Sequence, residues 1–290
     1  DGYEGPVFDW PSYHQLKETP EQIQHCIHEY AAVLSMCDHY LGKVLDMMDE
    51  YEMWDDTMLI VNTDHGFLLG EHDWWGKVMM PFYNEIAHTP LFIWDPRSGR
   101  KNERRQALVQ TIDLCPTLLE FFGVDIPEDV LGKSLTDTID HDAPVREYAL
   151  FGMHGCHVNI TDGHYVYMRA SAGGSEHNHE NLNNYTLMPA HMKDSFDLDE
   201  LKEMKLVEGF SFTKGLKVLS VPGTEKIATM GFPPATLFDG GNMLFDVTKD
   251  PGQEHPIHYP ETEQRMVENM IRLMEENDAP EEQYVRLGLR

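Results

Sequence analysis

The chain has 290 residues, of which 41 % are hydrophobic and 10 % aromatic, and this composition is typical of a folded protein, not of a disordered one. Its 22 basic and 50 acidic residues give a net charge of −28, which argues against nucleic acid and anionic membranes as partners. No stretch approaches the ~18 consecutive apolar residues of a membrane span, so none is expected.

A long helix is predicted near the start of the chain. The segment Thr19-Pro20-Glu21-Gln22 offers an N-cap, a proline at the first helical position and a capping-box partner. Apolar residues then recur at helical spacing to about Tyr51. The apolar runs 57–62 and 90–94 are typical of short strands buried in a parallel sheet. A further helix is expected from Asp113, as its cap, to about Gly123.

The second half of the chain has a different character. Short strands are predicted at 147–151, 158–161, 165–169 and 243–247, and Asp162-Gly163 is a hairpin signal between two of them. Residues 171–184 are expected to form a polar loop, and 261–276 has the spacing of an amphipathic helix. The expected fold class is α/β over residues 1–145, followed by a smaller α+β subdomain over 146–290 with an antiparallel sheet and a helix.

Polar side chains that suit a cation and an anion follow the first predicted strand. Asp64 and His65 stand at its carboxyl end, where open α/β sheets place ligands. Carboxylate oxygen and neutral imidazole nitrogen are ordinary ligands of divalent cations. Gly66 is expected to let the backbone bend away, and Lys77 can fold back to meet an anion as a point charge. On the pattern alone, turn capping and a metal site both stay open, and the position after a buried strand favours the metal site more than composition does.

Several stretches, taken in order, resemble the sulfatase family of the alkaline phosphatase superfamily. They are 56–72 with Lys77, 88–93, 113–119, 132–135 and 244–254. The resemblance implies that the chain is the C-terminal portion of such an enzyme. It also implies the second half of an alkaline-phosphatase-like sandwich over 1–145, closed by the C-terminal subdomain.

The resemblance further implies a sulfuric ester hydrolase that acts on sulfate monoesters of a carbohydrate or aryl compound. The family binds a divalent cation, calcium above all with Mn²⁺ or Mg²⁺ as alternatives, through four side chains. Asp64 and His65 match two of these ligands, and Lys77 matches the lysine that holds the sulfate. Histidine at the second position, where asparagine is common, is similar to the iduronate-sulfatase-like and phosphonate-hydrolase-like branches.

The nucleophile of the family has no counterpart here. It is a formylglycine made from the first residue of a C/S-x-P-x-R motif, and neither 115–117 nor 220–224 has that pattern. The family's N-terminal Asp-Asp pair of metal ligands is also missing. We therefore expect the chain alone to be inactive, and expect a missing N-terminal segment or chain to supply these groups. The alternatives are a phosphonate monoester or phosphodiester hydrolase of the same superfamily, and a non-catalytic subunit that completes a partner's site.

Further residues are weaker candidates for substrate contact, against an alternative of packing or a hydrogen-bonded loop. They are His72, Trp74, Trp75, His88 and His154. The four cysteines have no C-x-x-C spacing and are expected to be buried free thiols. The compartment stays open, because no signal peptide is recognisable after Asp1 and the natural N-terminus is expected to be missing.

Overall fold

A computed structural model of the chain describes residues 2–5, 15–77, 80–153, 155–173, 182–188, 190, 195–223 and 241–290. The chain forms two compact units. Unit 1 comprises Asp1–Val78, Tyr83–Ala107 and Leu135–Pro144, and unit 2 comprises Met79–Phe82, Leu108–Ser134 and Val145–Arg290. The domain boundary after residue 145 stays a prediction. Among the described residues, no helix combines the length and apolar character that crossing a membrane requires.

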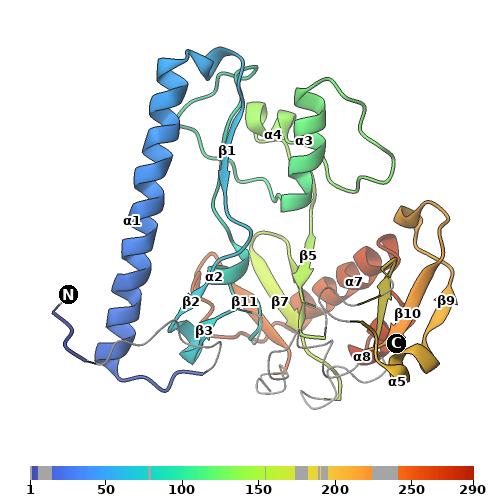
Figure 1. The fold of residues 1–290 in the computed structure, drawn as a ribbon. Helices are drawn as coiled ribbons and strands as arrows, with labels where there is room; N and C mark the ends of the chain where they lie inside the picture. The colour runs from blue at the N-terminus through green and yellow to red at the C-terminus, as the bar shows by residue number, and fades with distance from the viewer. Residues whose placement is uncertain are drawn as a thin grey trace. The chain divides into compact units, whose positions relative to one another are not determined.

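Unit 1 contains the long helix α1 (Pro20–Glu50), which confirms the first predicted helix (Figure 1). The hydroxyl of Thr19 accepts a hydrogen bond from the Gln22 backbone N–H, and the Gln22 side chain accepts one from the Thr19 backbone N–H. Within α1 only Cys26 and Met48 are buried. Apolar residues three or four positions apart form an exposed stripe on the helix, with side chains 43–63 % exposed: Val33, Met36, Tyr40, Val44, Met47 and, just after the helix, Tyr51.

The strands of unit 1 pair in two short antiparallel ladders. After the 3₁₀ turn η1 (Met53–Asp55), β1 (Leu59–Asn62) pairs with β4 (Leu91–Trp94), and β2 (Leu68–Leu69) pairs with β3 (Trp75–Gly76). The 3₁₀ turn η2 (Glu71–Asp73) joins the latter two, and the helices α2 (Asn84–Ala87) and α4 (Thr136–His141) complete the unit.

The positions of β1 and β4 were predicted, but the prediction of a parallel arrangement is wrong for this pair. Both strands are only partly buried, and Phe92 of β4 is 67 % exposed. An apolar run indicates that a strand packs against something, but it carries no information on the direction of the neighbouring strand.

Unit 2 is built on a four-stranded antiparallel sheet with the strand order β11-β7-β6-β5. Its strands are β5 (Ala149–Gly152), β6 (Val158–Thr161), β7 (Tyr165–Arg169) and β11 (Met243–Asp246), all at predicted positions. The predicted hairpin between β6 and β7 is confirmed. There the Asp162 carboxylate accepts hydrogen bonds from two backbone N–H groups, and Gly163 takes the left-handed backbone that the turn requires.

The helix α7 (Pro260–Glu276) supplies the core of unit 2, as its apolar spacing predicts. Met266, Met270 and Met274 recur every four residues and are 0–4 % exposed. They form a cluster with buried side chains of the sheet and of the region around α8 (Glu281–Arg286): Ile160, Tyr167, Leu244, Tyr284 and Leu287. The methionines of this helix are therefore core residues.

A second, three-stranded antiparallel sheet of unit 2 was not predicted. Its strands lie in the order β8-β10-β9 and are β8 (Asn183–Thr186), β9 (Lys205–Val207) and β10 (Val218–Pro222). Two short helical elements occur in the same part of the chain, α5 (Leu198–Glu203) and η5 (Ser211–Thr213). The predicted loop over 171–184 is therefore wrong at residues 183 and 184, which begin β8, and its part from 174 to 181 lies outside the described residues.

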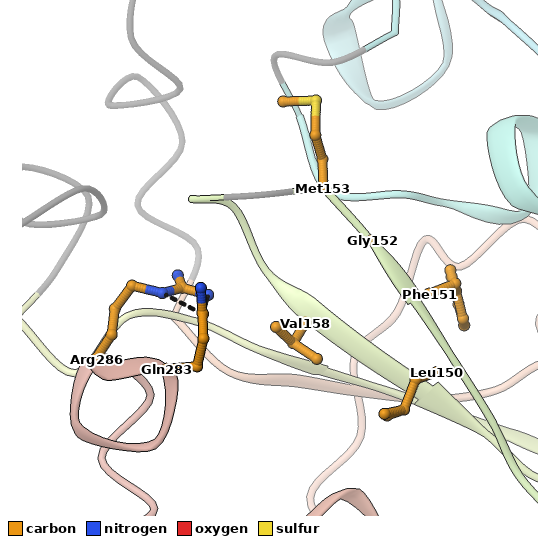
Figure 2. Close-up of a pocket in the computed structure, with 7 residues that line it drawn as sticks. All are labelled: Leu150, Phe151, Gly152, Met153, Val158, Gln283 and Arg286. Atoms are coloured by element: carbon orange, nitrogen blue, oxygen red, sulfur yellow. Dashed lines mark hydrogen bonds between the residues drawn. The ribbon is translucent and has the colours of Figure 1, made fainter. Parts of the chain in front are cut away.

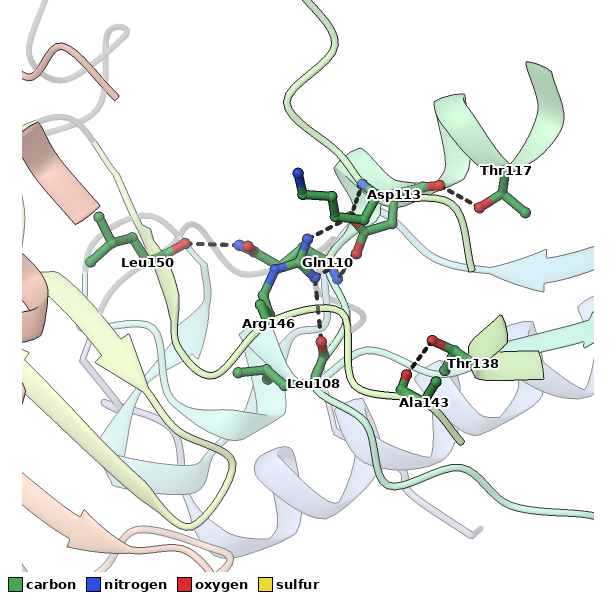
Figure 3. A network of polar contacts seen from close by, with 9 residues as sticks. Leu108, Gln110, Asp113, Thr117, Thr138, Ala143, Arg146 and Leu150 are labelled. Atoms are coloured by element: carbon green, nitrogen blue, oxygen red, sulfur yellow. Dashed lines mark hydrogen bonds and ion pairs between the residues drawn. The ribbon is translucent and has the colours of Figure 1, made fainter. Parts of the chain in front are cut away.

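The helix predicted from Asp113 is found as the turn η3 (Thr111–Asp113) followed by α3 (Leu114–Phe121). The prediction that Asp113 caps α3 is wrong, because its side chain makes no capping hydrogen bond to that helix. The fully buried carboxylate instead accepts hydrogen bonds from the Gln110 backbone N–H (2.7 Å) and the Lys133 backbone N–H (2.9 Å). Both oxygens also meet the guanidinium of Arg146, at 2.5 Å each (Figure 3).

Candidate functional site

The end of β1 carries the two candidate metal ligands, Asp64 and His65. The turn that follows the strand is held by its own side chains. The hydroxyl of Thr63 donates to the His65 carbonyl at 3.1 Å, and the Asp64 carboxylate accepts from the His65 backbone N–H at 3.0 Å. Turn capping by Asp64, the alternative to metal binding, is therefore present, and it occupies one carboxylate oxygen, Oδ1.

Gly66 fixes how this turn packs on α2. Its backbone N–H donates to the Ile86 carbonyl at 2.8 Å, and the next N–H, of Phe67, donates to the Glu85 carbonyl at 3.1 Å. A Cβ atom on Gly66 would lie 1.7 Å from the Glu85 carbonyl oxygen. The glycine is needed for this close approach. It is not among the residues with a left-handed backbone, and the expected bend at Gly66 stays a prediction.

Three side chains converge in the turn, because the β2–β3 ladder returns the chain toward it. The Nε2 atom of His65 lies 3.1 Å from Oδ2 of Asp64, and the Nζ atom of Lys77 contacts the same Nε2 atom. The other ring nitrogen, Nδ1, is 2.9 Å from the Gly66 carbonyl oxygen and donates to it. With Nδ1 donating to the carbonyl, Nε2 is the ring nitrogen that faces Oδ2 of Asp64 and Nζ of Lys77, and it is the nitrogen that a neutral ring would offer to a cation.

The electrostatics of the site favour an ionised carboxylate. Desolvation acts to raise the pKa of Asp64, but the charge of His65, hydrogen bonds from backbone N–H groups and the charge of Lys77 outweigh it, and the pKa lies below its usual value. The Asp64 side chain is 81 % exposed and that of His65 34 % exposed, so both are accessible to a ligand.

A carboxylate oxygen and an imidazole Nε2 are a donor set that suits a divalent cation. They are two ligands, whereas such cations in proteins take four or more. Among the described residues, no group of three or more His, Cys, Asp and Glu side chains is arranged to hold a metal. Asp64 and His65 thus fit part of a metal site.

His72 is packed inside unit 1. Its ring stacks on Tyr83 with 3.6 Å between the ring centroids, and its Nε2 atom lies 3.6 Å from a carboxylate oxygen of Glu85. His72 also has a left-handed backbone, which a bulky residue rarely adopts. Tyr83 and Glu85 were not singled out from the sequence, where nothing marks them as neighbours of His72. A substrate contact by His72 stays a prediction.

The two tryptophans are also core residues of unit 1. Trp74 is 1 % exposed and Trp75 is fully buried, with its indole N–H donating to the Glu18 carboxylate at 2.8 Å. This burial agrees with the packing alternative and does not favour a sugar contact, which stays a prediction.

The last two candidates differ in what the structure says of them. His88 is exposed at the end of α2, so its role stays a prediction, and His154 lies outside the described residues.

All four cysteines are free thiols. Cys26 and Cys156 are buried as expected, whereas Cys37 and Cys115 are exposed, so the expectation of burial is wrong for those two.

The turn at the end of β1 falls in a segment with known counterparts. The model of the sulfatase family matches residues 9–124, which include Asp64, His65 and Lys77. This match and the curated relatives show that the chain is similar to sulfatases over part of its length.

Two curated relatives and one solved structure illustrate the likeness. The N-acetylglucosamine-6-O-sulfatase of Bacteroides thetaiotaomicron is 31 % identical over 121 residues, which are 42 % of this chain and 21 % of that protein. The arylsulfatase of Clostridium perfringens is 32 % identical over 142 residues, which are 47 % of this chain and 28 % of that protein. The structure of BT4656 in complex with its substrate D-glucosamine-2-N,6-O-disulfate has a TM-score of 0.60 at 16 % identity, and covers 91 % of this chain and 44 % of that one.

The structural likeness establishes the fold and confirms the predicted class, a mixed α/β chain whose C-terminal part has a small antiparallel sheet. The chain spans less than a third of the length of the two curated relatives and less than half of BT4656.

Proposed function

We propose that this chain forms part of a metal-dependent sulfatase that hydrolyses sulfate monoesters of a carbohydrate, and that it belongs to the branch with an Asp-His metal pair. The observation that carries the proposal is the convergence of Asp64, His65 and Lys77 at the end of β1. The carboxylate and the imidazole are directed toward positive charge, and the lysine supplies a mobile cation beside them. The sulfated sugars of the curated and structural relatives support a carbohydrate substrate.

Each of the three residues has a chemical role in this proposal. Asp64 and His65 would hold a divalent cation, Ca²⁺ in preference to Mn²⁺ or Mg²⁺, which when bound neutralises charge on the sulfate oxygens. Lys77 would move from His65 to a sulfate oxygen and bind it as a point charge. The hydrogen bond from Nδ1 of His65 to the Gly66 carbonyl fixes the ring, so that Nε2 stays available as a ligand.

The nucleophile and the remaining metal ligands would come from a further segment, in the same polypeptide or in a partner chain. The surface of α1 supports this part of the proposal, because an exposed apolar stripe from Val33 to Tyr51 is typical of a face that packs against other protein. We propose that the segment with the formylglycine motif packs on this stripe and completes the α/β domain.

The proposal is tested on an enzyme assembled from this chain and a segment that carries a C/S-x-P-x-R motif. We expect turnover of glucosamine 6-sulfate or an aryl sulfate, and we expect Lys77→Met to lower kcat/KM by roughly 100- to 1,000-fold. Lys202→Met is the matched control, because this lysine is exposed and paired with Asp199 at 2.8 Å. Equal activity of the two variants would exclude the role given to Lys77.

The metal role is tested by the calcium content and calcium affinity of the same enzyme. Asp64→Asn and His65→Ala each remove one ligand and should weaken calcium binding by at least tenfold, whereas His65→Asn keeps an oxygen donor and should retain binding. Calcium binding that is the same in all three variants would contradict the assignment of Asp64 and His65.

The alternative substrate class is a phosphonate monoester or phosphodiester. These esters are tetrahedral like a sulfate ester, and Asp64, His65 and Lys77 suit either group. A panel of aryl sulfate, aryl phosphonate and aryl phosphodiester decides between them by kcat/KM. Higher kcat/KM for either phosphorus ester would replace the sulfatase proposal. The chain by itself is expected to be inactive on every substrate, and turnover by the pure 290-residue chain would refute the need for a further segment.

A further inference from the structure

A pocket of about 250 Å³ lies in unit 2, beside the four-stranded sheet. Its lining is divided into two kinds of side chain (Figure 2). Gln283 and Arg286 of α8 present polar groups. The strands β5 and β6, with the residue that follows β5, present mainly apolar ones: Leu150, Phe151, Gly152, Met153 and Val158. The pocket is somewhat smaller than the ~300–1,000 Å³ of sites for drug-sized ligands, so it fits a small molecule or one ring of a larger one.

Arg286 is unusual because its charge is buried without a counter-ion in the part of the chain that the structure describes. The residue is 6 % exposed, yet among the described residues no carboxylate pairs with it. Its three hydrogen bonds go to neutral acceptors. Nε and Nη2 donate to the Gln283 side-chain oxygen at 3.2 and 3.1 Å, and Nη1 donates to the Cys156 carbonyl at 2.9 Å.

The surroundings of Arg286 do not compensate its charge. Burial raises the pKa of the neighbouring Cys156 thiol to about 11, so this group is neutral at physiological pH. Burial also lowers the pKa of His157, and the positive charge of Arg286 lowers it further, so the imidazole is neutral as well. The guanidinium itself stays protonated, since desolvation lowers its pKa only to about 10.

The hydrogen bonds of Arg286 leave donors to spare. A guanidinium has five N–H groups, and the three bonds take one hydrogen from each of its three nitrogens. One N–H on Nη1 and one on Nη2 therefore have no acceptor among the described residues. Spare N–H groups on the two terminal nitrogens of a guanidinium can bind carboxylate and sulfate-like oxyanions.

A purely structural role explains only part of this arrangement. The bond from Arg286 to the Cys156 carbonyl connects α8 to the start of β6, but a neutral donor would make the same bond without burying a charge. Most arginines of unit 2 are paired: Arg146 meets Asp113, Arg265 meets Asp162 and Arg272 meets Glu276. In a chain with 50 acidic residues, a buried arginine that has no carboxylate partner among the described residues is a candidate for binding an anion from outside.

We propose that this pocket binds a small acidic sugar, with its oxyanion, a carboxylate or a sulfate group, on Arg286 and its ring against Val158 and Leu150. The proposal is independent of the function proposed above, because it uses residues of unit 2 alone. The Gln283 side chain orients the guanidinium by accepting two of its hydrogen bonds. The apolar strands supply a surface for the C–H face of a sugar ring.

The test is a calorimetric titration of the 290-residue chain with sodium glucuronate, glucosamine 6-sulfate, inorganic sulfate and glucose. We expect one saturable site for at least one of the two acidic sugars and none for glucose. Comparison of glucuronate with glucosamine 6-sulfate tells which oxyanion is preferred, and a bare sulfate that binds as tightly as both sugars would exclude the sugar part of the proposal.

Two variants locate the site. Arg286→Gln should weaken binding by roughly 10- to 100-fold, because a charge-assisted pair is lost. Gln283→Glu should also weaken binding although Arg286 is retained, because the new carboxylate pairs with the guanidinium in place of the ligand. This variant keeps the test decisive if Arg286→Gln does not fold. Arg272→Gln is the matched control and should bind as the unmodified chain does, since Arg272 is exposed and already paired with Glu276.

The outcomes separate ligand binding from a structural role. If Arg286 only connects α8 to β6, one of two results is expected. Either Gln283→Glu binds the acidic sugar as tightly as the unmodified chain does, or the unmodified chain binds neither acidic sugar. Each of these results overturns the proposal. If the pocket is the site, Gln283→Glu keeps its thermal midpoint and loses affinity, because the new carboxylate replaces the ligand as the partner of a charge that is already buried.

Discussion

Replacing Asp113 by asparagine tests the most deeply buried ion pair among the described residues. The carboxylate is fully buried and accepts four hydrogen bonds, two of them from Arg146, whose side chain is 12 % exposed. Asparagine has nearly the same shape, but it loses the negative charge and turns one acceptor into a donor. That donor then faces the N–H groups of Arg146 or of the backbone.

The expected cost follows from this geometry. Removing one partner of a buried ion pair leaves the other charge uncompensated and typically costs about 3–5 kcal/mol. The stability of a domain is of order 5–15 kcal/mol, so Asp113→Asn should remove a large fraction of it. With a urea m-value of about 3 kcal/mol/M, the unfolding midpoint should fall by about 1–1.7 M.

Urea unfolding followed by far-UV circular dichroism at pH 7 measures this change. Glu276→Gln breaks an exposed pair on α7 and should shift the free energy of unfolding by only about 0.3–0.5 kcal/mol. The double variant Asp113→Asn with Arg146→Met removes both charges and should be more stable than Asp113→Asn alone. A midpoint of Asp113→Asn within ~0.2 M of the unmodified chain would refute the reasoning.

The same substitution has a signature in pH. Burial acts to raise the pKa of Asp113, but hydrogen bonds from Arg146, Lys133 and Gln110 outweigh it, so the pKa lies below its usual value. A lowered folded-state pKa stabilises the fold above the unfolded pKa of about 3.9, and this contribution is lost as the pH falls through the folded-state pKa. Asp113→Asn should therefore lose less stability than the unmodified chain when the pH is lowered from 5 into that range.

Three further predictions concern packing and thiol chemistry. Gly66→Ala should destabilise the chain by about 1–3 kcal/mol, because its Cβ would meet a backbone carbonyl at 1.7 Å, whereas Gly42→Ala in the open interior of α1 should stabilise it by about 0.5–1 kcal/mol in the same urea assay. Met270→Ala opens a cavity at a fully buried position and should cost about 2–5 kcal/mol; a cost below 1 kcal/mol would argue against the assigned core. At pH 8 the buried Cys156, whose pKa is raised to about 11, should react with a thiol reagent roughly 100-fold more slowly than the exposed Cys37, and equal rates observed by peptide mass spectrometry would be inconsistent with its burial.

Elements with strong local signals were predictable from the sequence. Thr19 and Gln22 form the capping box that their spacing indicates, and β6 and β7 have the predicted bounds. One local signal was readable and was missed. Asp197, followed three residues later by Glu200, is a capping box, and in the structure it begins α5.

The remaining features depend on contacts between distant residues. Arg286 and Arg290 lie four positions apart, and nothing local distinguishes them. Arg290 is partly exposed and pairs with two glutamates of unit 2, while Arg286 is buried because it reaches the carbonyl of Cys156, 130 positions away. Trp75 likewise becomes a core residue through Glu18, 57 positions away. Sequence pattern alone contains no information on such partners.

The candidate site likewise combines features that local sequence predicts with one that depends on a more distant residue. Asp64 and His65 were predictable because they are adjacent and follow a strand, and the return of Lys77 to them depends only on the short β2–β3 ladder. What holds the turn in place, the close approach of the Glu85 carbonyl to Gly66, involves a residue 19 positions later and was not predictable from the motif.

The exposed stripe of α1 also determines how copies of this chain behave in solution. Its apolar side chains favour association of one copy with another, whereas a net charge of −28 keeps copies apart. Salt screens only the second effect, since the Debye length falls from about 10 Å at 0.1 M to about 3 Å at 1 M. The chain should therefore be monomeric in dilute buffer and self-associate as salt is added, the reverse of a protein held together by ion pairs.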